Sequence, residues 1–177
     1  MQPVVWEPPV ALAPAEAAIV RRIRRAKLFV FLREHRHALF AAAFPEELAA
    51  TCKESTHGQP PAPPAQLALA LLLQADTRVS DDEVIEATTM DRRWQLVLDC
   101  HDAEHAPVSK GTLVGFRQRL IAADLDRRLL ERTVELYEAQ HGKPAGGRLR
   151  VALDSSPLWG AGRVEDTLRW GTRCARR

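Results

Sequence analysis

The sequence predicts a mainly α-helical protein with a single strand near its C-terminus. Apolar residues recur at helical spacing through most of residues 15–142, and prolines and glycines interrupt the pattern where short helices would end. Residues 148–154 (RLRVALD) instead alternate between polar and apolar side chains, which is typical of a strand. We therefore expect an extended arm over residues 1–14, a helical domain over residues 15–142 and a distinct segment over residues 143–177.

Composition favours one soluble globular domain. The 177 residues are 46% hydrophobic and 27% charged, so most of the chain can bury a core. Three widely spaced cysteines, Cys52, Cys100 and Cys174, argue against a disulfide framework. Residues 1–20 lack the apolar stretch of a signal peptide, and the longest apolar runs are too short to span a bilayer. We expect a cytoplasmic protein with no membrane partner.

The net charge of +2 conceals an uneven distribution. Residues 1–57 hold 8 basic and 6 acidic groups, residues 58–106 hold 3 and 9, residues 107–142 hold 6 and 5, and residues 143–177 hold 8 and 3. The first block contains a dense basic stretch made of Arg21, Arg22, Arg24, Arg25 and Lys27. Such asymmetry indicates a polyanionic partner, although a solvated helix face is the alternative for any single stretch.

The first half of the helical domain predicts three helices and a linker. Residues 15–43 are long enough for two helices broken near Lys27. Pro45 predicts the start of a short helix that runs to about Lys53, because proline suits the first helical position. Residues 54–64 (ESTHGQPPAPP) contain four prolines and predict a linker, since proline cannot continue a helix.

The second half of this domain predicts five helices. Residues 65–75 are leucine and alanine on nearly all sides, which indicates a buried central helix. Ser80 and Glu83 form a capping-box pattern before a helix over residues 81–90, and a short helix over residues 91–98 follows. Ser109 is the expected cap of a helix over residues 110–122. The last helix spans residues 125–140, ends at Gly142, and is expected to bury Leu129, Leu130, Val134 and Tyr137.

Asp154 stands where the predicted strand gives way to a turn. A carboxylate at the edge of a sheet can hold Mg²⁺ with few protein ligands. The alternative interpretation from composition alone is an aspartate that caps the turn.

Three segments resemble bacterial insertion-sequence transposases of the DDE class. Residues 148–167 (RLRVALDSSPLWGAGRVEDT) resemble the segment around the first catalytic aspartate of that family. Residues 64–100 (PAQLALALLLQADTRVSDDEVIEATTMDRRWQLVLDC) and residues 108–136 (VSKGTLVGFRQRLIAADLDRRLLERTVEL) resemble its InsH-type N-terminal domain. The resemblance implies N-terminal helices that bind double-stranded DNA at the terminal inverted repeats of the element. It also implies a ribonuclease-H-like core in which two aspartates and a glutamate hold two metal ions for strand cleavage and transfer.

The resemblance assigns Asp154 as the first of the three acids and as a Mg²⁺ ligand. The other two acids lie beyond position 177 in the family. One carboxylate cannot hold two cations about 3.5–4 Å apart, so we expect weak Mg²⁺ binding and no catalysis by this chain alone. The last residues (LRWGTRCARR) depart from the family and favour a transposase truncated or frameshifted just after the first acid, with one strand of an incomplete ribonuclease-H-like domain.

Two sets of residues are candidates for DNA binding. A helix-turn-helix-like core is expected from the helices over residues 65–75, 81–90 and 110–122, and the last of these is the better candidate for docking because residues 81–90 are strongly acidic. Arginine and glutamine can read base edges, and lysine and arginine can neutralise phosphates. The candidates are Lys110, Arg117, Gln118 and Arg119, and Arg21, Arg22, Arg24 and Arg25.

Two other functions stay open at this point. The chain could be a helical protein-interaction or scaffold module with no role in nucleic-acid binding. It could also be a truncated inhibitor that binds element ends, associates with itself or binds the full-length transposase.

Overall fold

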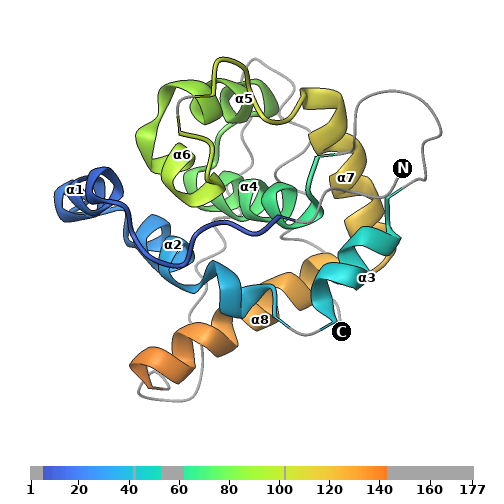
Figure 1. The fold of residues 1–177 in the computed structure, drawn as a ribbon. Coiled ribbons are helices and arrows are strands. Elements are labelled where there is room, and N and C mark those ends of the chain that lie inside the picture. The colour runs from blue at the N-terminus through green and yellow to red at the C-terminus, as the bar shows by residue number, and fades with distance from the viewer. Residues whose placement is uncertain (1–5, 42, 53–61, 102, 143–177) are drawn as a thin grey trace, which may run out of the picture.

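The structure is a computed structural model that describes residues 6–41, 43–52, 62–101 and 103–142. These residues form eight helices and no strand (Figure 1). In chain order the helices are α1 (Pro14–Arg22), α2 (Lys27–Leu39), α3 (Phe44–Ala50), α4 (Pro64–Thr77), α5 (Asp81–Met90), α6 (Arg92–Leu98), α7 (Lys110–Ala122) and α8 (Leu125–His141). The prediction of a mainly helical protein is confirmed for this part of the chain.

α4 is the central helix, as its composition predicts. Ten of its 14 residues are buried. Five other helices pack around it, namely α2, α3, α5, α6 and α7 (Figure 1). Neighbours on all sides explain why a helix with almost no polar face is stable here.

Side-chain caps begin three consecutive helices. Ser80 Oγ accepts the backbone N–H of Glu83 at 3.3 Å, and Glu83 Oε2 accepts that of Ser80 at 2.6 Å, which confirms the capping box. Ser109 Oγ accepts a backbone N–H of the first turn of α7 at 3.2 Å, as predicted. Asp91, predicted as a helical residue, instead caps α6 by accepting the N–H of Arg93 at 2.8 Å.

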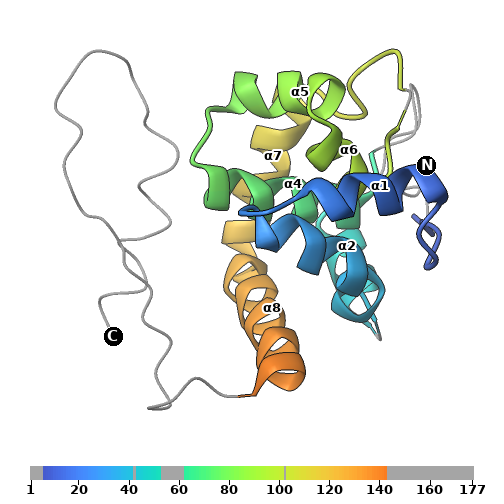
Figure 2. The ribbon, with the colours of Figure 1, turned by 90° about the vertical axis from the view of Figure 1, so that its left-hand side faces the viewer.

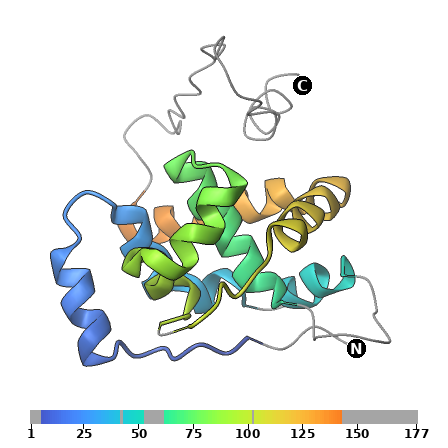
Figure 3. The ribbon, with the colours of Figure 1, turned by 90° about the horizontal axis from the view of Figure 1, so that it is seen from above.

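The N-terminal part of the described chain is an arm followed by α1. Residues 6–13 lie along one edge of the bundle and lead into α1 (Figure 3). The chain then turns through residues 23–26 into α2, so the predicted break near Lys27 is confirmed. α3 is shorter than predicted and ends at Ala50.

The packing of α8 differs from the prediction. Of the four residues expected in its core, only Leu129 is buried, whereas Leu130 is 38% and Tyr137 47% exposed. α8 packs by one side against α2 and α7, and its C-terminal half extends beyond α4 and α7 (Figure 2). Arg128 and Arg132 of α8 also lie over the ring of Phe44 in α3, but Leu130 remains exposed. Gly142 ends α8 as predicted, with a φ of 76° that glycine adopts without strain.

The predicted strand over residues 148–154 lies outside the described residues, and so does the ribonuclease-H-like segment that it would begin. Within the described part, none of the helices has the length and apolar character needed to cross a membrane.

Candidate nucleic-acid interface

A cluster of exposed arginines lies where α1 ends and the chain turns into α2. We call these four side chains, Arg21, Arg22, Arg24 and Arg25, the basic run. The first two belong to the last turn of α1 and the other two to the connection that follows. Ile23 and Ala26 in the same stretch pack against the core. The apolar residues thus anchor this turn while the arginines remain in solvent.

The positive charge of the basic run is not balanced by ion pairs within the described part of the chain. Among the residues that the structure describes, no carboxylate forms an ion pair with any of its four members. The planar guanidinium group presents paired donors that suit phosphate oxygens. Two of the four groups also lie at the C-terminal end of α1, where the helix dipole favours positive charge. As far as the described residues go, this surface can therefore bind an anion without first breaking an ion pair.

Arg117, a candidate for DNA binding from the sequence, is not available on the surface of α7. It is buried, pairs with Asp81 of α5, and donates to Gln74 Oε1 of α4 at 2.8 Å. The reason is helical spacing: position 117 lies four residues after Leu113 and next to Phe116, on the side that faces α4 and α5. Burial alone would raise the pKa of Asp81, but hydrogen bonds from Arg117 and Gln74 outweigh it and hold that pKa below 3.8.

The other candidates on α7 differ in what they offer to solvent. Lys110 is exposed, and its Nζ lies 2.8 Å from Asp82 of α5, so a carboxylate partly offsets its charge. Gln118 is exposed. Arg119 is half-buried. Its guanidinium lies beside Gly115 of the same helix, at 3.2 Å from the position that a Cβ on residue 115 would take. α7 thus presents less positive charge than its sequence predicts.

The two candidate sets do not form one surface. α1 and α7 lie on opposite sides of the molecule (Figures 1 and 3).

A shallow hollow of about 590 Å³ lies between α5 and the start of α7. Asp82, Ile85, Glu86 and Lys110 are among the residues that line it. Its two carboxylates repel phosphate, so the hollow is a poor candidate for binding nucleic acid.

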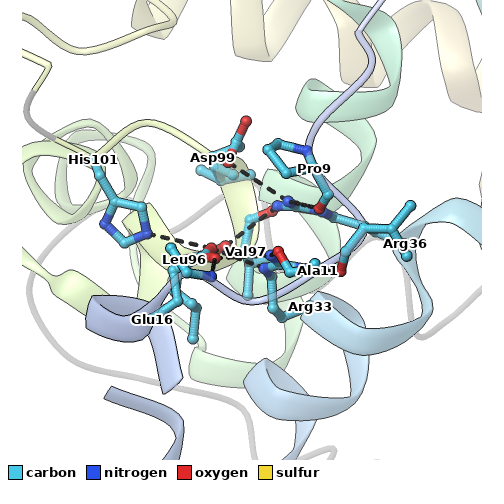
Figure 4. Close-up of polar contacts among 12 residues, drawn as sticks. Pro9, Ala11, Glu16, Arg33, Arg36, Leu96, Val97, Asp99 and His101 are labelled. Atoms are coloured by element: carbon cyan, nitrogen blue, oxygen red, sulfur yellow. Dashed lines mark hydrogen bonds and ion pairs between the residues drawn. The ribbon is translucent and has the colours of Figure 1, made fainter. Parts of the chain in front are cut away.

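The sequence analysis assigns no role to two arginines of α2 that the structure buries, Arg33 and Arg36. The guanidinium of Arg33 donates to both carboxylate oxygens of Glu16 in α1, each at 2.9 Å (Figure 4). It also donates to the backbone carbonyls of Val10 at 3.2 Å and Ala11 at 3.1 Å. Arg33 therefore connects α2 to both α1 and the arm.

Arg36 makes a second set of contacts beside it. Its guanidinium donates to Pro9 O at 3.1 Å and to the carbonyls of Leu96 and Val97 in α6 at 3.3 and 3.0 Å. It also lies 3.5 Å from a carboxylate oxygen of Asp99 (Figure 4). Burial lowers the pKa of Arg36 to about 10, so the group stays charged at neutral pH.

A signal for these two arginines is present in the sequence. Arg33 lies four residues after Phe29, and Arg36 lies four residues after Leu32. This spacing places both on the apolar side of α2, just as it places Arg117 on the apolar side of α7.

The predicted catalytic and Mg²⁺-binding residue, Asp154, lies outside the described residues. Within those residues, no group of three or more His, Cys, Asp or Glu side chains is arranged to hold a metal ion. The assignment of Asp154 and of Mg²⁺ therefore stays a prediction.

A family model described as a transposase domain (DUF772) matches residues 20–119, which is more than half of the chain. The chain belongs to this transposase-domain family. No curated protein and no solved structure matches the chain. The transposase domain runs from the last turns of α1 to α7, so it contains the basic run and both buried arginines of α2. Glu16 precedes it and α8 follows it.

Proposed function

We propose that this transposase-family protein binds double-stranded DNA, with the terminal inverted repeats of its element as the specific target. The observation that carries the proposal is the basic run: four exposed arginines with no carboxylate partner among the described residues. Arginines of this kind neutralise phosphates and position a protein on a duplex. Membership of a transposase-domain family supports DNA rather than another polyanion as the partner.

The phosphate contacts are assigned to the basic run rather than to α7. Lys110 is paired with Asp82, and Arg117 is buried with Asp81. Gln118 is the exposed group on α7 that could read a base edge. Because α7 lies on the opposite side of the molecule, we expect Gln118→Ala to leave the affinity for random duplex unchanged.

The catalytic part of the proposal concerns Asp154 alone. We assign it as the first acid of the DDE set and as a Mg²⁺ ligand, on the resemblance of the surrounding residues. That resemblance gives this chain one of three acids, and two-metal catalysis needs several anionic ligands. We therefore propose that this chain alone does not cleave DNA. Asp154-dependent, magnesium-dependent nicking of element-end DNA would contradict that proposal, while supporting the role assigned to Asp154.

A gel-shift series with element-end duplex and with random duplex, repeated across salt concentrations, tests the proposal. We expect both duplexes to be retained at low salt and the element-end duplex to be retained to higher salt. Alanine at all four positions of the basic run should weaken both complexes. Absence of retention at low salt would favour a protein-interaction module instead.

The inhibitor alternative shares DNA binding and is separated by a different assay. With element-end DNA in excess over both proteins, a chain that only binds DNA should leave the rate of transposition by the full-length enzyme unchanged, whereas a chain that binds the enzyme itself should lower it. A concentration-dependent loss of transposition would support the inhibitor role.

A further inference from the structure

We propose that Glu16 and Arg33 are positioning residues for the basic run. Their buried ion pair holds α1 against α2 and thereby sets the direction in which the four arginines face the DNA. This inference rests on the proposed function, because positioning matters only if the basic run contacts phosphates.

Glu16 performs two tasks with one carboxylate. It lies in the first turn of α1, accepts both hydrogen bonds from Arg33, and also accepts the backbone N–H of Ala13 at 2.8 Å. The two side chains are 8% and 1% exposed. A bidentate contact between a planar guanidinium and a carboxylate constrains direction as well as distance. The N-terminal end of α1 is therefore held in one orientation relative to α2.

α1 also packs against α6, and His101 Nε2 lies 3.7 Å from Glu16 Oε1, but these contacts bury little of the apolar surface of α1. Glu16 is the one buried residue of this helix, and the remaining residues of its nine are half-buried or exposed. Most helices are oriented by an apolar face buried against their neighbours, and α1 has only a weak one. Arg21 and Arg22 follow Glu16 by five and six residues on the same short helix, so a rotation of α1 moves them with it.

The same arginines also hold the arm that leads into α1. Arg33 binds the carbonyls of Val10 and Ala11, and Arg36 binds that of Pro9. The guanidinium of Arg36 lies over the ring of Trp6 at 5.4 Å from its centroid. The arm and the start of α1 thus form one attachment to α2, centred on two buried cations (Figure 4).

This attachment joins the matched transposase domain to residues outside the match. Arg33 lies within residues 20–119, whereas Glu16 and the arm precede them. The basic run begins directly after the start of the match. It follows the attachment at Glu16, and Ile23 and Ala26, which pack against the core, lie within it and directly after it.

The test uses the full chain and a double variant, Glu16→Gln/Arg33→Met. Removing both charges avoids leaving one of them buried and unpaired, which would threaten the fold itself. The matched control, Asp81→Asn/Arg117→Met, removes the other buried carboxylate–arginine pair, which joins α5 to α7 and does not involve α1. Each background is then combined with alanine at all four positions of the basic run, and the affinity for random duplex is measured at one salt concentration.

We expect the four alanines to weaken binding by the same factor in the wild-type and control backgrounds. In the Glu16→Gln/Arg33→Met background that factor should be about tenfold smaller, because arginines that are not preorganised lose conformational freedom on binding. An equal factor in all three backgrounds would overturn the positioning role and leave the proposed function intact. No effect of the alanines in any background would overturn the proposed function and with it this inference.

A second measurement needs no DNA. Trypsin cleaves after arginine, and cleavage of a folded protein requires local opening of the chain. We expect cleavage within residues 21–25 to be about tenfold faster in Glu16→Gln/Arg33→Met than in the wild type or the control. Equal cleavage rates in the three proteins would show that the ion pair does not hold α1, and would overturn the inference even if the variant binds DNA less well.

Discussion

Buried ion pairs connect two pairs of helices in this protein. Arg33 pairs with Glu16 across α2 and α1, and Arg117 pairs with Asp81 across α7 and α5. Taking a charge out of water costs on the order of several kcal/mol unless a partner and further hydrogen bonds compensate it. Each of these arginines makes such bonds, because Arg33 donates to two backbone carbonyls and Arg117 donates to Gln74 Oε1. Because their hydrogen bonds are directional, these pairs fix the relative orientation of the helices more specifically than an apolar contact of the same size would.

Arg117→Ala is predicted to be strongly destabilising. It leaves Asp81 buried without its partner, and such a loss typically costs about 3–5 kcal/mol. The control is Arg127→Ala, which removes an exposed i, i+4 pair with Glu131 and should cost about 0.5 kcal/mol or less. Urea unfolding measures both free energies. A loss for Arg117→Ala as small as that for Arg127→Ala would contradict the importance of the buried pair.

Acid should destabilise the fold through Glu16 and Asp81. Burial alone would raise the pKa of each, but bonds from Arg33 and Ala13 to Glu16, and from Arg117 and Gln74 to Asp81, hold both values below their usual 4.5 and 3.8. A carboxylate with a lowered pKa in the folded state stabilises the fold above its unfolded pKa, and this stabilisation is lost as the pH falls through the lower, folded value.

The pH prediction follows from that sign. The free energy of unfolding should be nearly constant from neutral pH down to about pH 5 and should fall below it. Combining Glu16→Gln/Arg33→Met with Asp81→Asn/Arg117→Met should make this fall shallower, and urea unfolding at a series of pH values measures it. Wild type and variant with the same acid dependence would show that neither carboxylate contributes.

At the scale of helices, the local signals were sufficient to predict where most of them begin and end. Ser80, Glu83 and Ser109 mark helix starts by bonds within one turn, and the uniform apolar character of α4 predicts its central place. The side that each helix buries was harder to predict, because it depends on neighbours distant in sequence. α8 shows this: its pattern predicts burial of Leu129, Leu130 and Tyr137, yet only Leu129 is buried.

Two adjacent leucines test that correction for α8. Leu129 is fully buried and Leu130 is 38% exposed. We predict that Leu129→Ala lowers the free energy of unfolding by about 2–5 kcal/mol, because it leaves a cavity. The same change at Leu130 should cost less than about 1 kcal/mol. Similar losses at both positions, measured by urea unfolding, would mean that the outer side of α8 is covered after all.

The candidate site was predictable in part for the same reason. The arginines of the basic run are charged, lie near a helix end, and are exposed as their sequence suggests. The charges on α7 are in part neutralised by two acids of α5: Asp81 precedes its partner Arg117 by 36 positions, and Asp82 precedes its partner Lys110 by 28. A pattern within one helix does not show which acids another helix will bring to it.

At the scale of the whole molecule, the acidic middle of the chain has a definite role. Residues 58–106 carry 9 acidic and 3 basic groups, and two of these acids pair with cations of α7. The basic run on the opposite side has no such partner among the described residues, so it remains a source of uncompensated positive charge (Figure 1). This asymmetry favours one side of the transposase domain for binding DNA.

The salt dependence of DNA affinity tests the central claim, that the basic run contacts phosphates, most directly. Two pairs from the run, Arg21→Ala/Arg22→Ala and Arg24→Ala/Arg25→Ala, are compared with Arg78→Ala/Arg92→Ala, which removes the same charge from exposed positions elsewhere. Affinity falls as salt rises, and each lost phosphate contact reduces the magnitude of the slope of log K against log salt by about one. We predict that the magnitude of the slope falls by about two for each pair from the run and is unchanged for the control pair. Wild-type slopes in both pairs from the run would contradict the claim.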